Sequence, residues 1–182
     1  MRAIEALERL KDGHSRFLKG TRESTNKTLS YAKQLHNKQE PFAVIVSCSD
    51  SRVSPELIFD AGFGDLFTIR TAGNIISDYD LASIEYAVLF LDVRLILVVG
   101  HSDCGAVRAA AEDTPCDSMY LTGLKDAITA VIEVEMSLDD IAQAHIEKEA
   151  SSLTARSKIL SQTGQLRIAT CFYRLDNGKI CW

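Results

Sequence analysis

Two cysteines and one histidine stand at positions from which they could bind a metal ion. Cys48 follows an apolar run that begins at Phe42, while His101 and Cys104 come just after a second run, residues 95–99. Continuous apolar runs of this length are typical of strands buried on both faces, as in a parallel sheet. Because the carboxyl ends of such strands line one crevice, we expect the three side chains to meet there.

The chemistry of this set favours zinc. Two thiolates and one imidazole suit Zn²⁺ and leave a fourth position for water, which is typical of catalytic sites and not of closed structural ones. A helix beginning after Cys104 favours its thiolate through the helix dipole. The spacing alone leaves a second interpretation open, because a buried cysteine is often a small hydrophobic residue and a histidine at a strand end is often only hydrogen-bonded.

A carboxylate and a guanidinium follow Cys48, two residues apart. Asp50 and Arg52 can form a charge-assisted, bidentate pair. A carboxylate held by arginine stays off the metal, yet it can accept a hydrogen bond from water bound there. The alternative is a surface ion pair of little energetic value.

Composition limits the class of protein. The 182 residues are 46% hydrophobic, carry a formal net charge of −5 and include 5 cysteines. No basic run exceeds two residues, which argues against a nucleic-acid or anionic-membrane surface, and no apolar run approaches the roughly 20 residues of a membrane span. We expect a cytoplasmic protein with free or metal-bound thiols, since no signal peptide is recognisable and the cysteines are odd in number.

The hydrophobic pattern predicts the elements that position these residues. Strands are expected over residues 42–46, 65–70 and 95–99, and a hairpin near the end pairs 166–173 with 179–182. Helices are expected over 3–18, 27–37, 78–91 (largely buried), 106–111 (capped by Ser102 or Asp103) and in pieces over 118–162, with a restart at 137–140. The fold class is therefore α/β, a central, mostly parallel sheet with an antiparallel edge, flanked by helices.

One domain, residues 1–182, accounts for the whole chain. Within it we distinguish an N-terminal helical arm (1–37), a core that carries the zinc ligands (41–112), and helices with a terminal hairpin (118–182). His14, His36 and His145 lack ligand partners and are expected to be solvated, with His145 and Glu149 forming an i, i+4 helix pair. Cys171 and Cys181 could face each other on the hairpin, but we expect them to remain thiols.

Four segments resemble, in order and at similar spacing, the signature blocks of the β-class carbonic anhydrases: CSDSRV (48–53), RTAGN (70–74), SIEYAV (83–88) and GHSDCGAV (100–107). The resemblance implies reversible hydration of carbon dioxide to bicarbonate and a proton. It implies Zn²⁺ on Cys48, His101 and Cys104, with Asp50 and Arg52 as the catalytic pair. In this mechanism zinc lowers the pKa of its water from 15.7 toward about 7, and Asp50, kept ionised by Arg52, orients the resulting hydroxide.

The resemblance also implies how carbon dioxide or bicarbonate is bound. Gln39 matches a glutamine whose amide hydrogen-bonds the substrate, Phe67 and Tyr86 match aromatic residues that wall the pocket, and Ala72 and Gly105 match small lining residues. It further implies a homodimer or tetramer in which the N-terminal helices reach across to the partner and both subunits line each active site. For the lining residues, plain core packing is the alternative.

The chain departs from the family pattern at several places. Thr71 stands where asparagine is frequent, and residues 113–163 match no motif. Ile45 stands where the bicarbonate-gated branch carries tryptophan, so we expect that regulatory pocket to be absent or altered. Water on the zinc is then the default state, and Asp50 is the fourth ligand only in a closed state.

Three other functions compete with this one. A hydrolase of carbon disulfide or carbonyl sulfide could use the same site, and parallel substrate assays would separate it. A zinc-bearing but inactive binding or sensing oligomer is disfavoured by the intact Gln39, Asp50 and Arg52. A thiol redox protein would need a resolving cysteine such as a Cys-x-x-Cys pair, which the sequence lacks.

Overall fold

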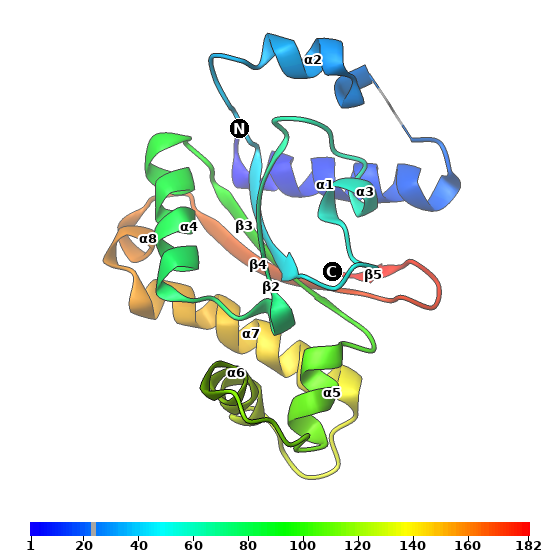
Figure 1. Ribbon diagram of the computed structural model, residues 1–182. Coiled ribbons are helices and arrows are strands. Elements are labelled where there is room, and N and C mark those ends of the chain that lie inside the picture. Colours follow the sequence, from blue (N-terminus) through cyan, green and yellow to red (C-terminus); the bar gives the residue numbers. More distant parts are fainter. Residues whose placement is uncertain (23–24) are drawn as a thin grey trace.

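The computed structural model describes residues 1–22 and 25–182 and shows helices packed on both faces of a five-stranded sheet (Figure 1). The strand order is β2-β1-β3-β4-β5, with bounds β1 (Ala43–Cys48), β2 (Leu66–Thr71), β3 (Leu95–His101), β4 (Arg167–Tyr173) and β5 (Ile180–Cys181). The first four strands run parallel and β5 pairs antiparallel with β4. The predicted mostly parallel sheet with an antiparallel edge is therefore confirmed.

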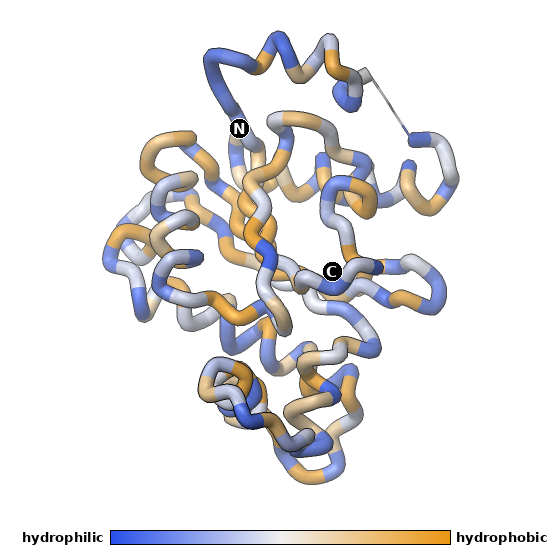
Figure 2. The backbone as a smooth tube through the Cα atoms, viewed as in Figure 1, coloured by the Kyte–Doolittle hydropathy of each residue, from blue (hydrophilic) through white to orange (hydrophobic). Residues whose placement is uncertain are grey.

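The central strands are buried along their whole length. Every residue of β1 and of β3 is buried, and Figure 2 shows these hydrophobic segments at the centre of the chain. Successive side chains of a strand point to opposite faces. Val44 and Val46 accordingly pack in one hydrophobic core, and Ala43 and Ile45 pack in another on the opposite face.

Helix α1 (Ala3–Lys19) covers one face of the sheet together with the short α3 (Pro55–Ile58). Leu7 and Leu10 enter the core of that face. Close approach needs a glycine at position 13, because a Cβ there would lie 1.9 Å from the carbonyl oxygen of Phe59. The rest of the predicted arm contains η1 (Thr25–Lys27) and α2 (Leu29–Gln34), while residues 23 and 24 lie outside the described part. A contact of this arm with a partner stays a prediction.

The other face is covered by α4 (Asp78–Phe90), α7 (Leu138–Arg156) and α8 (Lys158–Gln162). Both expected starts are confirmed, because Ser77 and Ser137 each form a capping box. The prediction that residues 78–91 are largely buried is wrong for the outer half of α4. Tyr79 and Phe90 are 88% and 72% exposed. The helix carries apolar side chains on all its sides, but only one side packs against the sheet.

Helices α5 (Gly105–Ala111) and α6 (Met119–Thr129) stand beyond the carboxyl ends of the strands (Figure 1). The predicted cap of α5 by Ser102 or Asp103 is wrong: the N-cap is Cys104, without a side-chain cap bond. Asp103 adopts a left-handed φ of 54°, and its carboxylate accepts hydrogen bonds from Arg52 and Arg108. Two guanidinium partners thus occupy the group that could have capped the helix.

Burial corrects the prediction for two histidines. His36 is exposed as expected, but His14 is 4% and His145 is 1% exposed. The expected His145–Glu149 pair is replaced by separate backbone partners, Gly73 for His145 and Ile76 for Glu149.

The expected free thiols are confirmed on the terminal hairpin. Both Cys171 and Cys181 are free, and the strand register places Cys181 opposite Phe172. Among the helices of the described residues, none combines the length and apolar character that a bilayer span requires.

Candidate metal centre and active site

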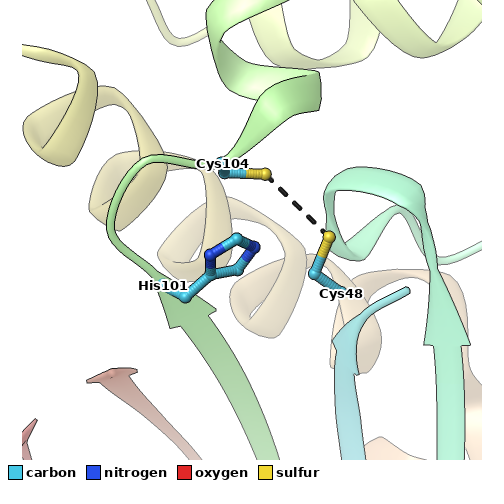
Figure 3. A group of neighbouring side chains, drawn as sticks. All are labelled: Cys48, His101 and Cys104. Atoms are coloured by element: carbon cyan, nitrogen blue, oxygen red, sulfur yellow. Dashed lines mark hydrogen bonds between the residues drawn. The ribbon is translucent and has the colours of Figure 1, made fainter. Parts of the chain in front are cut away.

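The three predicted ligands meet at the carboxyl ends of neighbouring strands. Cys48 ends β1, His101 ends β3, and Cys104 follows in the turn that leads into α5, so the three side chains converge (Figure 3). Their ligand atoms all lie within 4.8 Å of one another, and the two sulfurs are 3.9 Å apart. All three residues are buried. This set could hold a metal ion.

The hydrogen bonding of His101 shows that the set suits a cation. Its Nδ1 lies 2.9 Å from the carbonyl oxygen of Ser102. Because a carbonyl oxygen only accepts, Nδ1 is the donor, and in the neutral ring Nε2 then presents a lone pair. That Nε2 is buried without a hydrogen-bond partner. An unpaired imidazole nitrogen beside two thiols is the donor set that zinc prefers, and the Nδ1 bond fixes the ring as outer partners of metal-binding histidines do.

The two thiols differ in acidity. The contact with the Cys104 thiol, whose sulfur lies 3.9 Å away, lowers the pKa of Cys48 against the effect of burial. The same contact and burial raise the pKa of Cys104. The start of α5 acts in the predicted direction, because the backbone N–H groups of Ala106 and Val107 lower the pKa of Cys104. In the metal-free pair the neighbouring Cys48 and burial outweigh this effect, so the pKa of Cys104 is raised overall.

Asp50 and Arg52 form the expected bidentate pair. Arg52 donates from Nε to Oδ1 of Asp50 at 3.0 Å and from Nη2 to Oδ2 at 2.8 Å, and its backbone N–H donates to Oδ1 at 2.9 Å. These bonds from Arg52 lower the pKa of Asp50 to about 2, so the carboxyl is ionised at neutral pH. Arg52 also contacts Asp103, which ties the pair to the turn between His101 and Cys104.

Sequence reasoning gave no role to Arg70, although it lies in the segment RTAGN. Its guanidinium donates to the backbone carbonyls of Cys48 and Asp50, at 3.1 and 2.8 Å. Its position could have indicated a role, because Arg70 lies near the carboxyl end of β2, in register with Ser47 of β1. It therefore holds the segment that carries both Cys48 and the carboxylate of Asp50.

The small residues expected in the pocket lie beside the cysteine ligands. Ala72 follows Thr71, which pairs with Cys48 in the register of β1 and β2, and Gly105 is the first residue of α5, directly after Cys104. A Cβ at Gly105 would meet no atom within 4 Å, so the space beside it is open.

The other predicted pocket residues lie at the opposite end of the sheet. Gln39 precedes β1, whereas Cys48 ends it, and the six residues of the strand span roughly 20 Å. Phe67 pairs with Val44 near the beginning of β1, and its ring lies 6.4 Å from that of Tyr86. Gln39 and Tyr86 line one shallow depression. Within one chain, these residues do not join the metal ligands.

Comparison with known proteins agrees with this geometry. The family model for carbonic anhydrase matches residues 43–180. Carbonic anhydrase 2 of Mycobacterium tuberculosis (strain ATCC 25618 / H37Rv) is 36% identical, covering 97% of this chain and 90% of the relative. A carbonic anhydrase of Pseudomonas aeruginosa is also 36% identical, covering 90% of this chain and 76% of the relative.

Solved structures give the same result. The Coccomyxa β-carbonic anhydrase in complex with acetazolamide superimposes with a TM-score of 0.72 at 26% identity, covering 84% of this chain and 77% of that one. One of two tetrameric β-carbonic anhydrases from Sordaria macrospora gives 0.68 at 28% identity, with 82% and 83% covered. The chain therefore belongs to the β-carbonic anhydrase family and is a carbonic anhydrase.

Proposed function

We propose that this protein hydrates carbon dioxide reversibly at a zinc ion held by Cys48, His101 and Cys104. The observation that carries the proposal is the buried, unpartnered Nε2 of His101 beside two thiols. Zinc, when bound there, supplies a Lewis acid that lets water ionise near neutral pH. Stopped-flow hydration of carbon dioxide by protein of measured zinc content tests the proposal; zinc-loaded protein without hydration activity would contradict it.

Asp50 is the residue that orients the attacking water. As a carboxylate it can only accept, so a water molecule beside it must donate a hydrogen to it and turn a lone pair away from it. Arg52 holds the carboxylate by three hydrogen bonds and keeps it ionised. Orientation of this kind lowers the activation free energy of the attack on carbon dioxide, because the entropic cost of aligning the two reactants is already met when they bind.

The substrate of this site is small and uncharged. Ala72 and Gly105 present little side-chain volume, and the space beside Gly105 is open. A neutral, linear molecule needs no charged partner to enter such a space. The negative charge that develops on its oxygen during attack needs a hydrogen-bond donor, and the amide of Gln39 is our candidate.

A second copy of the chain would supply that donor. Gln39, Phe67 and Tyr86 lie at the opposite end of the sheet from the ligands of their own chain, and β2 is an edge strand. Apolar side chains on α4 beside this edge are exposed, Phe90 by 72%. A symmetric dimer that covers this surface would bring these residues of each subunit to the metal site of the other. The Sordaria macrospora relatives are tetrameric.

Subunit complementation tests this arrangement. Asp50→Asn and Gln39→Ala chains, each of low activity alone, are co-expressed with different affinity tags. A mixed dimer then contains one site with both residues intact, and random pairing restores about a quarter of the wild-type activity. If Gln39 served its own chain, mixing would restore nothing.

We also propose a closed state in which Asp50 leaves Arg52 and becomes the fourth zinc ligand. Reaching it requires breaking the three Asp50–Arg52 hydrogen bonds. Activity should then fall steeply and reversibly toward acid pH. Zinc X-ray absorption that finds the same oxygen ligand at both pH extremes would exclude this state. A cytoplasmic location is proposed from the free cysteines, which suit a reducing compartment.

A further inference from the structure

Two buried side chains of α7 contact the turn that follows β2. Nε2 of His145 lies 2.8 Å from the carbonyl oxygen of Gly73, and Oε2 of Glu149 accepts a hydrogen bond from the backbone N–H of Ile76 at 3.0 Å. The two residues are 1% and 7% exposed. No step of the proposed reaction uses either, and Figure 1 shows α7 passing close to the end of β2.

The backbone of this turn has a conformation that few residue types adopt. Gly73 and Asn74 have φ values of 67° and 62°, both in the left-handed region. Glycine and, to a lesser degree, asparagine are the residues that enter this region routinely. Asn74 is further fixed by its side chain, which donates to the carbonyl of Val99 at 2.7 Å. The turn is therefore held from β3 on one side and from α7 on another.

The same turn is joined to the backbone beside both cysteine ligands. The N–H of Ser49, next to Cys48, donates to the carbonyl of Thr71 at 3.0 Å, and a Cβ at Gly73 would lie 3.1 Å from the Cβ of Ala106, two residues after Cys104. A shift of Gly73 would therefore move backbone on both sides of the metal site. His145 holds the carbonyl of this same residue, so one peptide segment connects α7 with the metal site.

The role of His145 is that of a hydrogen-bond donor. The Gly73 carbonyl only accepts, so Nε2 carries the proton. Nδ1 is buried without a partner, and a proton placed there would have no acceptor. The ring is thus kept neutral, and its single described hydrogen bond is the one to the turn.

We propose that His145 and Glu149 are positioning residues of the metal site, which hold the turn at residues 72–76 so that it supports the backbone beside the cysteine ligands. The inference rests on the zinc site proposed above. Neither residue contacts the metal ligands, so each acts only through the turn. Groups that hydrogen-bond a metal ligand directly typically contribute 10–100-fold to metal affinity, and for these more remote residues the expected loss is at the lower end, about 10-fold for each.

Matched substitutions separate positioning from packing. Glutamine and methionine have nearly the same length and shape, but only glutamine can donate to Gly73 or accept from Ile76. We expect His145→Met and Glu149→Met to weaken zinc binding ~10-fold in competition with a chromophoric chelator, and His145→Gln and Glu149→Gln to keep the wild-type affinity. Glu147→Gln and Glu147→Met, on the exposed side of the same helix, are the controls.

A second measurement reports on the ligand itself. In the cobalt-substituted protein, the thiolate-to-metal absorption should shift in the methionine variants and not in the glutamine variants. Equal affinities and spectra within each pair would overturn the proposal, whether both match wild type or both are reduced. If a methionine variant does not fold, the glutamine variant decides: retained affinity supports the proposal and lost affinity overturns it. Wild-type protein that binds no zinc would instead contradict the proposed function.

Discussion

Substitution of Asp50 by asparagine tests the centre of the proposed mechanism. The wild-type carboxylate receives three hydrogen bonds from Arg52 at 2.8–3.0 Å. Asparagine keeps one oxygen and places an NH₂ group where the other oxygen accepted, so it cannot satisfy Arg52 and accept from water in the same geometry. A hydrogen bond to a charged group contributes about 1.5–3 kcal/mol, and its loss lowers the paired population about 10–100-fold.

The orienting role of Asp50 adds to this loss. Misplacing a reactant by about 1 Å can cost about 100-fold, so we expect kcat/KM for carbon dioxide hydration to fall by about that factor. Zinc content should not change, because the three ligand atoms belong to Cys48, His101 and Cys104. Stopped-flow hydration, normalised to zinc measured on the same sample, gives the result.

The chain offers a matched control for this variant. Asp92 and Arg94 have the same spacing and also form an ion pair, but they lie at the amino end of β3, and the Asp92 side chain is 73% exposed. Asp92→Asn should retain wild-type hydration. Unchanged hydration in zinc-loaded Asp50→Asn would remove the carboxylate from the mechanism. Loss of zinc in that variant would mean that Asp50 supports the metal and not the water.

Three further predictions concern stability. Burial raises the pKa of Glu149 above its unfolded value of 4.5, so the stability contributed by the protonated side chain is complete below pH 4.5 and is lost as pH rises through the pKa of the folded state. In denaturant unfolding, wild type should therefore lose stability relative to Glu149→Gln as pH rises. A stability difference that stays constant with pH would contradict this. Removing zinc with a chelator should lower the melting temperature, since a ligand at 1,000 times its Kd stabilises by about 4 kcal/mol; an unchanged melting temperature would exclude a tightly bound metal. Ser77→Ala removes a capping box and should destabilise by about 1 kcal/mol in the same unfolding assay, whereas equal stability would show that α4 does not depend on its cap.

Local patterns were enough to predict the elements that carry the ligands. The runs around Val44 and Val98 have the length and continuous apolar character that favour strands buried on both faces, and in the structure both strands are fully buried. The starts of α4 and α7 depend on contacts three residues apart, which a sequence displays directly. The convergence of Cys48, His101 and Cys104 followed from a topological rule, since parallel strands end at one edge.

Features that depend on contacts between distant parts of the chain could not be predicted from the sequence. His14 and His145 look like ordinary polar helix residues, and only the packing of α1 and α7 buries them. The acidity of the two thiols depends on which one donates across the 3.9 Å between the sulfurs, which the spacing of Cys48 and Cys104 does not reveal.

The amino-acid sequence by itself determined the strands, the helix starts and the metal-binding set, because these depend on short-range periodicity and on one rule of sheet topology. Only the tertiary structure decided that α7 reaches the turn at Gly73 and that His145 is buried there. These contacts join residues that are far apart in the sequence. Many alternative packings of the same helices and strands would bring other residues together, and the free energy of the whole fold determines which packing forms.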